Sequence, residues 1–200
     1  MGARTKIVTD PLSDNNPITI QVLGICSALA ITIQVENAFV MACALTFVLT
    51  SSNVIISLLR KLIPGRIRMI VEISIIAALV VLVDQTLRAF FFELSRQLSI
   101  FVALIITNCI VMGRAEAFAT QHPPGPSLLD GLGNSIGYSV IIILVATGRE
   151  ILGSGTWYGI RVLPEAYMGN GLAVLAPGAF LILGIIIWIQ RTATSNFKDD

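Results

Sequence analysis

Charged side chains are scarce in this sequence. Asp, Glu, Lys and Arg together make up 12% of its 200 residues, whereas soluble domains contain about 25%. The net charge is +1, and no run of basic residues is longer than Arg60-Lys61. The chain therefore lacks the basic surface that nucleic-acid-binding proteins use, and we exclude nucleic acid as a partner.

Histidine and cysteine are also rare. The sequence has one histidine, His122, and three cysteines, Cys26, Cys43 and Cys109. Three cysteines in apolar surroundings do not form a disulfide framework. A structural zinc site takes four Cys or His ligands, and His122 lies in a proline-rich stretch well away from the cysteines in sequence. We predict that His122 is a loop residue.

Apolar side chains are what the sequence has in place of charge, at 55% of its residues. A membrane-spanning helix needs about 20 consecutive apolar residues, and most of the apolar stretches approach this length. The composition predicts an all-α integral membrane protein with six transmembrane segments, at residues 18–35, 38–59, 67–91, 98–118, 127–152 and 172–189.

The first and fourth of these segments are short or interrupted. Gly24 interrupts the first segment, and the apolar run 98–112 of the fourth has about 15 residues before charges begin, too few to cross a bilayer. Each segment carries one cysteine, Cys26 or Cys109. Short or Gly-interrupted segments at corresponding positions of two halves mark the working site of an inverted-repeat membrane protein. We therefore predict that both cysteines lie at the site.

The six segments form two sets of three, each of which begins with a short or broken helix. We assign residues 1–95 to the first repeat and 96–200 to the second, within a single membrane domain. An odd number of segments precedes the second repeat, which inverts its direction. Nine of the 13 Lys and Arg residues fall on the side that holds both termini, so the positive-inside bias predicts that both termini are cytoplasmic.

Local signals predict where some segments begin. Asn16 is a possible cap with Pro17 at the first helical position of the first segment. Ser127 followed three residues later by Asp130 resembles a capping box that opens the fifth segment.

Other signals predict how the fifth segment packs and ends. Gly133-x-x-x-Gly137 predicts a face for close packing against a neighbouring helix. The charged pair Arg149 and Glu150 is predicted to mark the end of the span.

The chemistry of the cysteines leaves two readings open. A buried cysteine in a helix is most often a small hydrophobic residue, and we expect this of Cys43. Cys26 and Cys109 lie where helices break, so backbone N–H groups there are free to hydrogen-bond sulfur and tune a thiolate-bound cluster. An iron–sulfur cluster takes four cysteines, so two must come from another chain. Alternatively, the protein is a secondary transporter that holds a solute between Cys26 and Cys109.

Carboxylates inside membrane segments are functional hypotheses by default. We single out Asp84 and Asp130 as a possible ion path. The alternative for Asp84 is an ion pair with Arg88, one helical turn on, and the alternative for Asp130 is the capping box. Glu36 and Glu116 are expected to close the two short helices at a membrane interface.

Two strings give the sequence a family resemblance, LGICSALA at residues 23–30 and LIITNCIVMGRAEAF at residues 104–118. They resemble the family of D subunits of the sodium-translocating NADH:quinone oxidoreductase (Na+-NQR). The strings NNP at 15–17, VDQ at 83–85 and SLLDG at 127–131 extend the match over nearly the whole chain. The related Rnf electron-transport complex has a counterpart of this protein, and Ser-Ala after the first cysteine looks more like the Na+-NQR form.

The resemblance implies a multi-pass protein of the bacterial inner membrane that works with the A, B, C, E and F subunits of the complex and performs no independent catalysis. It implies an intramembrane [2Fe-2S] cluster shared with the E subunit, to which this chain contributes Cys26 and Cys109. Electrons would pass from the NADH-oxidising F subunit toward the covalent FMN of the C subunit, and onward to ubiquinone, coupled to Na+ export.

Overall fold

The chain folds into helices of very unequal length, and the computed structural model describes residues 11, 16–90, 103–157, 160–161 and 171–198. A two-stranded antiparallel hairpin, β1 (Thr156–Trp157) and β2 (Ile160–Arg161), is the only sheet within these ranges. The helical elements are α2 (Ile25–Ile31), α3 (Val35–Leu59), α4 (Arg68–Phe90), α6 (Cys109–Arg114), the π-helical turn η1 (Ala115–Ala119), α7 (Pro124–Ser154), α8 (Gly171–Val174) and α9 (Ala176–Lys198).

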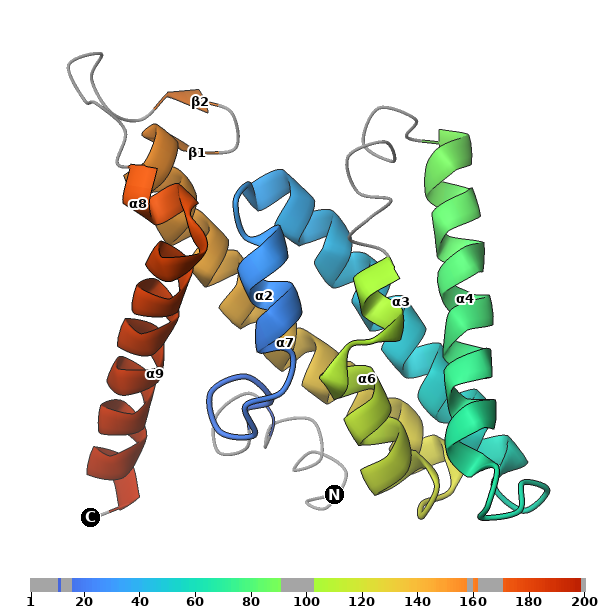
Figure 1. Ribbon diagram of the computed structural model, residues 1–200. Helices are drawn as coiled ribbons and strands as arrows, with labels where there is room; N and C mark the ends of the chain where they lie inside the picture. Colours follow the sequence, from blue (N-terminus) through green and yellow to red (C-terminus); the bar gives the residue numbers. More distant parts are fainter. Residues whose placement is uncertain (1–10, 12–15, 91–102, 158–159, 162–170, 199–200) are drawn as a thin grey trace.

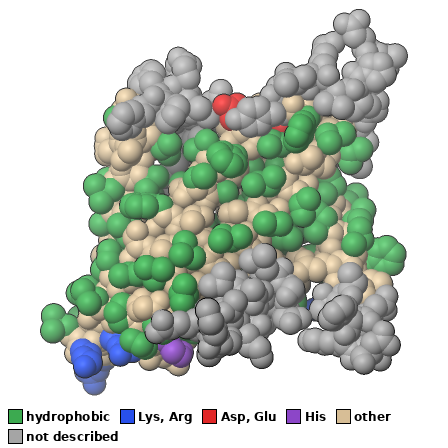
Figure 2. All heavy atoms as spheres, turned by 180° about the vertical axis from the view of Figure 1, so that it is seen from behind, with side chains coloured by type: hydrophobic (Ala, Val, Ile, Leu, Met, Phe, Trp, Pro, Cys, Tyr) green, Lys and Arg blue, Asp and Glu red, His purple; other side chains and the backbone are tan. Residues whose placement is uncertain are grey.

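Three helices of the described part are long and apolar enough to cross a membrane: α3, α7 and residues Arg68–Ala89 of α4. A shorter apolar stretch, Ala176–Thr192, lies in α9. Large hydrophobic side chains are exposed on all four helices, as Figure 2 shows for one face of the molecule. Such a surface is unfavourable in water and favourable in lipid. The prediction of a helical integral membrane protein is thus confirmed.

The core lies between α3 and α7, which pack side by side and run in opposite directions (Figure 1). Gly131 of α7 allows the close approach, because a Cβ there would lie 3.1 Å from the Cα of Thr50 in α3. Helices without a hydrophobic driving force between them depend on such backbone contacts. Among the buried side chains of this core are Leu45, Val48, Leu49, Tyr138, Ile141, Ile142 and Val145.

The short helices α2 and α6 run in opposite directions (Figure 1). α2 leads into the start of α3 at one end of the molecule, and α6 with η1 leads into the start of α7 at the other. Each described half therefore has a short helix followed by a long one. The predicted boundary between the repeats, at residues 95 and 96, lies outside the described residues.

A buried charged pair at the end of α7 holds the turn between α2 and α3. Arg149 donates to the carbonyl oxygen of Leu29 at 2.9 Å and to the Thr32 hydroxyl at 2.8 Å. The Glu150 carboxylate accepts from the backbone N–H of Val35 at 2.8 Å. A cation thus meets the carbonyl end of α2 and an anion meets the N–H end of α3, as the helix dipoles favour.

The far end of α3 supports the other turn in the same way. Ser57 donates to the carbonyl oxygen of His122, and Arg60 donates to that of Gln121 at 2.9 Å. These two carbonyls lie in the turn between η1 and α7. Each long helix therefore fixes the turn that joins the short and long helices of the other half.

Two predictions about the start of the chain were wrong. The first helix of the described residues covers Ile25–Ile31 rather than 18–35, and residues 17–20 form turns. Asn16 does cap backbone groups, since its side-chain oxygen accepts from the N–H groups of Ile18 and Thr19 at 3.0 and 3.4 Å, but it caps these turns and no helix begins at Pro17.

The predicted start of the fifth segment was also wrong. α7 begins at Pro124, with Pro123 as its N-cap. Proline is compatible with the first turn of a helix because the N–H it lacks has no intrahelical partner there. Ser127 already lies inside the helix and donates to the carbonyl oxygen of Pro123 at 3.0 Å, so Ser127 and Asp130 do not form a capping box.

The packing of α7 differs from the prediction too. A Cβ on Gly137 would lie 2.6 Å from the carbonyl oxygen of Pro11, so this glycine faces the N-terminal segment rather than a helix. Arg149 and Glu150 are 2% and 6% exposed and lie near the end of α7, which continues to Ser154. Their place at the end of the membrane span stays a prediction.

Candidate metal centre

Cys26 is the second residue of α2, directly after a sharp break in the backbone. Gly24 precedes the helix with a φ of 79°, in the left-handed region that favours glycine. The side chain of Cys26 is exposed on the surface of the chain. The predicted interruption at Gly24 therefore places this cysteine at the start of a short helix.

Cys109 occupies the equivalent position in the second half. Residues 103–106 are helical, the helix is interrupted at Thr107 and Asn108, and α6 begins at Cys109. The Asn108 side chain caps α6 by accepting from the N–H of Ile110 at 3.3 Å. Cys109 is exposed as well. The fourth segment is thus broken at Thr107 and Asn108, directly before its cysteine. The sequence predicted instead that it ends at the charges after residue 112, but α6 and η1 continue through these charges to Ala119.

The two breaks touch. Asn108 donates through its side-chain amide to the Ser27 hydroxyl oxygen at 3.0 Å. The Ser27 hydroxyl also lies 2.6 Å from that of Tyr138 in α7. A Cβ on Gly24 would lie 2.8 Å from a ring carbon of Tyr138 and 3.2 Å from the side-chain oxygen of Asn108. The neighbours of Cys26 and Cys109 in sequence are therefore in direct contact in space.

This donor set fits half of a four-thiolate centre. No group of three or more His, Cys, Asp or Glu side chains suited to a metal ion occurs among the described residues. At the two helix breaks the chain offers two thiols, and both are exposed, so ligands from a second chain can reach them. A complete cluster normally has four Cys ligands.

Cys43 lies apart from this pair. It lines an apolar groove of about 530 Å³ between α3 and α4, together with Phe39, Phe47, Leu82 and Val83. Its side chain is exposed, so the prediction of a buried cysteine was wrong for this chain by itself.

Asp84 and Asp130 each lie beside an arginine. Asp84 pairs with Arg88 at 2.9 Å, as the alternative reading predicted. Asp130 pairs with Arg114 of α6, whose Nε donates to the carboxylate at 3.0 Å, and it also accepts from the Asn134 amide at 3.0 Å. The carboxylate of Asp130 thus joins α6 to α7.

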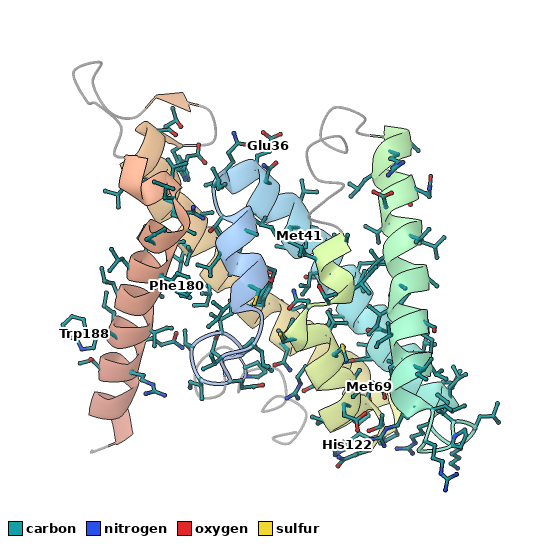
Figure 3. All side chains as sticks on the ribbon, viewed as in Figure 1. Glu36, Met41, Met69, His122, Phe180 and Trp188 are labelled. Carbon is teal, nitrogen blue, oxygen red and sulfur yellow. The ribbon has the colours of Figure 1, made fainter. Side chains whose placement is uncertain are left out.

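The remaining singled-out residues lie near the ends of the molecule. Glu36 is in the first turn of α3, and Glu116 of η1 pairs with Arg68 of α4. His122 is exposed in the turn before α7, where its ring stacks on Phe118 with centroids 4.0 Å apart. Figure 3 shows Glu36 and His122 at opposite ends of the molecule. His122 is therefore a loop residue, as predicted.

Three residues of the site were missed by sequence reasoning. Ser27 and Asn108 each adjoin a predicted ligand, and Asn108 had a usable signal because asparagine is a common helix cap. Tyr138 had none, since it lies 111 residues from Ser27.

The fold and the site define an integral membrane protein in which two interrupted helices bring a pair of cysteine-bearing breaks into contact. Residues 4–187 match the family model described as Rnf-Nqr subunit, membrane protein. The chain belongs to this Rnf-Nqr family, which confirms the predicted resemblance.

Several relatives are similar over nearly their whole length. The chain is 55% identical over 192 residues to the D subunit of the Na(+)-translocating NADH-quinone reductase from Aeromonas salmonicida (strain A449), covering 94% of this chain and 91% of that protein. It is 54% identical over 192 residues to the protein of the same name from Haemophilus ducreyi (strain 35000HP / ATCC 700724), covering 94% and 93%. For that of Psychromonas ingrahamii (strain DSM 17664 / CCUG 51855 / 37), the identity is 56% over 191 residues, covering 93% and 91%.

Proposed function

We propose that this chain is a redox component of a sodium-pumping NADH:quinone oxidoreductase and supplies half of an intramembrane [2Fe-2S] site. The contact between the two helix breaks carries the proposal, because it brings Cys26 and Cys109 to one place from segments far apart in sequence. When bound, such a cluster accepts and releases one electron at a time. The role of this chain is to hold two of the thiolates and to shield one side of them from water.

The partners follow from the relatives and the donor count. The relatives carry the name of the D subunit of a Na(+)-translocating NADH-quinone reductase. We assign this chain to a complex with A, B, C, E and F subunits, in which the E subunit provides the other two thiolates. Electrons then pass from the F subunit toward the FMN of the C subunit and on to ubiquinone. An Rnf-type complex is the alternative, and the names of these relatives favour the quinone reductase.

The spectrum of the purified complex tests this function against a transporter. A cluster at this site should add an EPR signal, a visible absorption band and about two irons to those of the soluble components. A complex that reduces quinone without this additional iron would contradict the redox role. Sodium or solute binding between the two half-helices α2 and α6, without iron, would favour the secondary transporter.

We further propose that the two halves are inverted repeats in a bacterial inner membrane, with the basic end of the molecule in the cytoplasm. The opposite directions of α2 and α6 support the inversion (Figure 1). Lys and Arg side chains gather at one end and acidic ones at the other on the face in Figure 2. The basic end holds the turn between α3 and α4, with Arg60, Lys61 and Arg66. Basic loops remain on the cytoplasmic side.

Reporter fusions check this orientation. Fusions after Lys6 and Lys198 should both report the cytoplasm, because an even number of spans separates the two ends in the six-span model. A fusion in the turn at Gly65 should also report the cytoplasm, whereas one at Gly155 should report the periplasm. A periplasmic result at Lys6 or Lys198 would rule out six inverted spans.

Asp84 and Asp130 remain our proposed ion path, and the structure favours Asp84 as the group that contacts sodium. One oxygen of Asp84, Oδ1, is buried without a hydrogen-bond partner among the described residues. Both oxygens of Asp130 are engaged by Arg114. Oxygen ligands suit a hard cation. The Asp84 carboxylate has one oxygen, Oδ1, that could act as such a ligand.

Substitution by asparagine separates the two carboxylates. Asp84→Asn should raise the sodium concentration needed for half-maximal quinone reduction, by about 10-fold if it removes an ionic contact worth about 1.4 kcal/mol. Asp130→Asn should instead weaken the α6–α7 contact, because it leaves the half-buried Arg114 without its carboxylate. Steady-state kinetics across sodium concentrations, with thermal stability of the complex as the control, measure both effects. An unchanged sodium dependence in Asp84→Asn would remove it from the path.

A further inference from the structure

A buried polar cluster lies between the two half-helices and the core. Its members are Ser27 of α2, Asn108 at the break before α6, and Tyr138 of α7, which are 3%, 4% and 0% exposed. Buried polar groups cost free energy unless they are hydrogen-bonded, so a cluster that satisfies its members is specific for one geometry. This cluster joins three elements that the sequence separates widely.

The hydrogen bonds of Ser27 can be assigned atom by atom. Its hydroxyl lies 2.9 Å from the carbonyl oxygen of Gly24, which only accepts, so Ser27 donates there. The Asn108 amide donates to the Ser27 oxygen, and the Tyr138 hydroxyl completes the set by donating as well. Ser27 then donates one bond and accepts two, the full capacity of a hydroxyl.

We propose that Ser27, Asn108 and Tyr138 are positioning residues that set the separation of the two cysteines before any cluster binds. Cys26 adjoins Ser27 and Cys109 adjoins Asn108, so the bond between Ser27 and Asn108 fixes both ligands through one covalent step on each side. That this separation serves to bind a cluster rests on the proposed function. The contacts among Ser27, Asn108 and Tyr138 belong to this chain alone.

The half-helices need such a device because they are short. α2 has seven residues and α6 has six, and isolated helices below about 12 residues are marginal. Their starts also lack the rigidity of a continuous helix, since each follows a break. Metal sites lose function when ligands are held too loosely, which supporting hydrogen bonds prevent. Tyr138 meets this need from the rigid centre of α7.

The test measures the separation of the thiols directly, without iron. In a Cys43→Ser background, nitroxide labels on Cys26 and Cys109 of the full chain should give a dipolar EPR spectrum with a narrow distribution of distances. Tyr138→Phe keeps the ring and removes only the hydroxyl. Ser27→Ala removes the hydroxyl that bonds to both Tyr138 and Asn108. Both should broaden the distribution.

Ser52→Ala is the matched control. Ser52 is also buried in a helix and donates to the carbonyl oxygen three residues earlier, that of Leu49, at 3.1 Å. Its loss should leave the label distances unchanged. In the assembled complex, Tyr138→Phe should lower the occupancy of the cluster by about 10-fold, the lower range for loss of an outer-shell partner, whereas Ser52→Ala should not.

The two measurements separate failure of this proposal from failure of the proposed function. An unchanged label distribution in Tyr138→Phe and Ser27→Ala would overturn the positioning role, whatever the iron content. A broadened distribution in a protein whose complex holds no iron at Cys26 and Cys109 would support the positioning role and contradict the cluster. If Ser27→Ala fails to insert, Tyr138→Phe decides, because it retains the packing of the ring.

Discussion

Cys26→Ala or Cys109→Ala should remove the intramembrane iron and reduce electron flow from NADH to quinone to the background rate. Each substitution deletes one of only two thiolates that the helix breaks present, and neither cysteine has a described His, Cys, Asp or Glu cluster beside it to take over. A cluster with three ligands is not held stably. Iron content, the EPR spectrum and quinone reduction by the purified complex measure the loss.

Cys43→Ala is the control within the same chain. Cys43 is exposed like the other two cysteines but lies in the groove between α3 and α4, away from both breaks. Its substitution should cost less than about 1 kcal/mol of stability, as for other surface positions, and leave the iron in place. Equal loss of iron in all three variants would refute the assignment of Cys26 and Cys109.

The sequence was most informative where a glycine interrupts an apolar stretch. Gly24 in an apolar stretch predicted an interruption of the first segment, and this interruption is present. The charges after residue 112 predicted the end of the fourth segment, whereas α6 and η1 continue to Ala119 and the break lies earlier, at Thr107 and Asn108. These signals are local, since a glycine in the left-handed region or a charged residue in lipid has the same cost in any fold. In the structure, Cys26 and Cys109 both lie at the start of a short helix that follows a break.

Helix boundaries were harder to predict because tertiary contacts set them. Residues 18–24 are apolar enough for a helix, yet the chain turns there, with Asn16 capping the turns and also donating to the carbonyl oxygen of Gly137 in α7 at 3.3 Å. Hydrophobicity alone does not distinguish a buried turn from a buried helix. The same holds for Arg149 and Glu150, whose partners lie on distant turns that no local pattern reveals.

The joining of the two breaks could not be predicted at all. Ser27 and Asn108 are 81 residues apart, and Tyr138 is an ordinary aromatic residue in an apolar helix. Their contact exists because α3 and α7 pack side by side, so that the starts of α2 and α6, which precede them, meet (Figure 1). Long-range geometry of this kind follows from the whole fold, whereas sequence patterns report on one element at a time.

The thiols of Cys26 and Cys109 are exposed on the chain by itself, which makes the site incomplete without a partner. The partner must bring two thiolates and an apolar surface, because the exposed faces of α2 and α6 otherwise meet lipid. We therefore expect that the chain expressed alone is inserted in the membrane but essentially free of iron. Co-expression with the E subunit of such a complex should restore about two irons per pair, as for one [2Fe-2S] cluster.

Variants of the partner make this expectation decisive. Substituting the partner's own cysteines should remove the iron although this chain is unchanged, and the loss should equal that in Cys26→Ala. Cys43→Ala in the same pair should retain the iron, which shows that the assay reports on the ligands rather than on expression. A full complement of iron in the isolated chain would contradict the shared site. An iron-free pair within a complex that still reduces quinone would show that Cys26 and Cys109 serve only in packing.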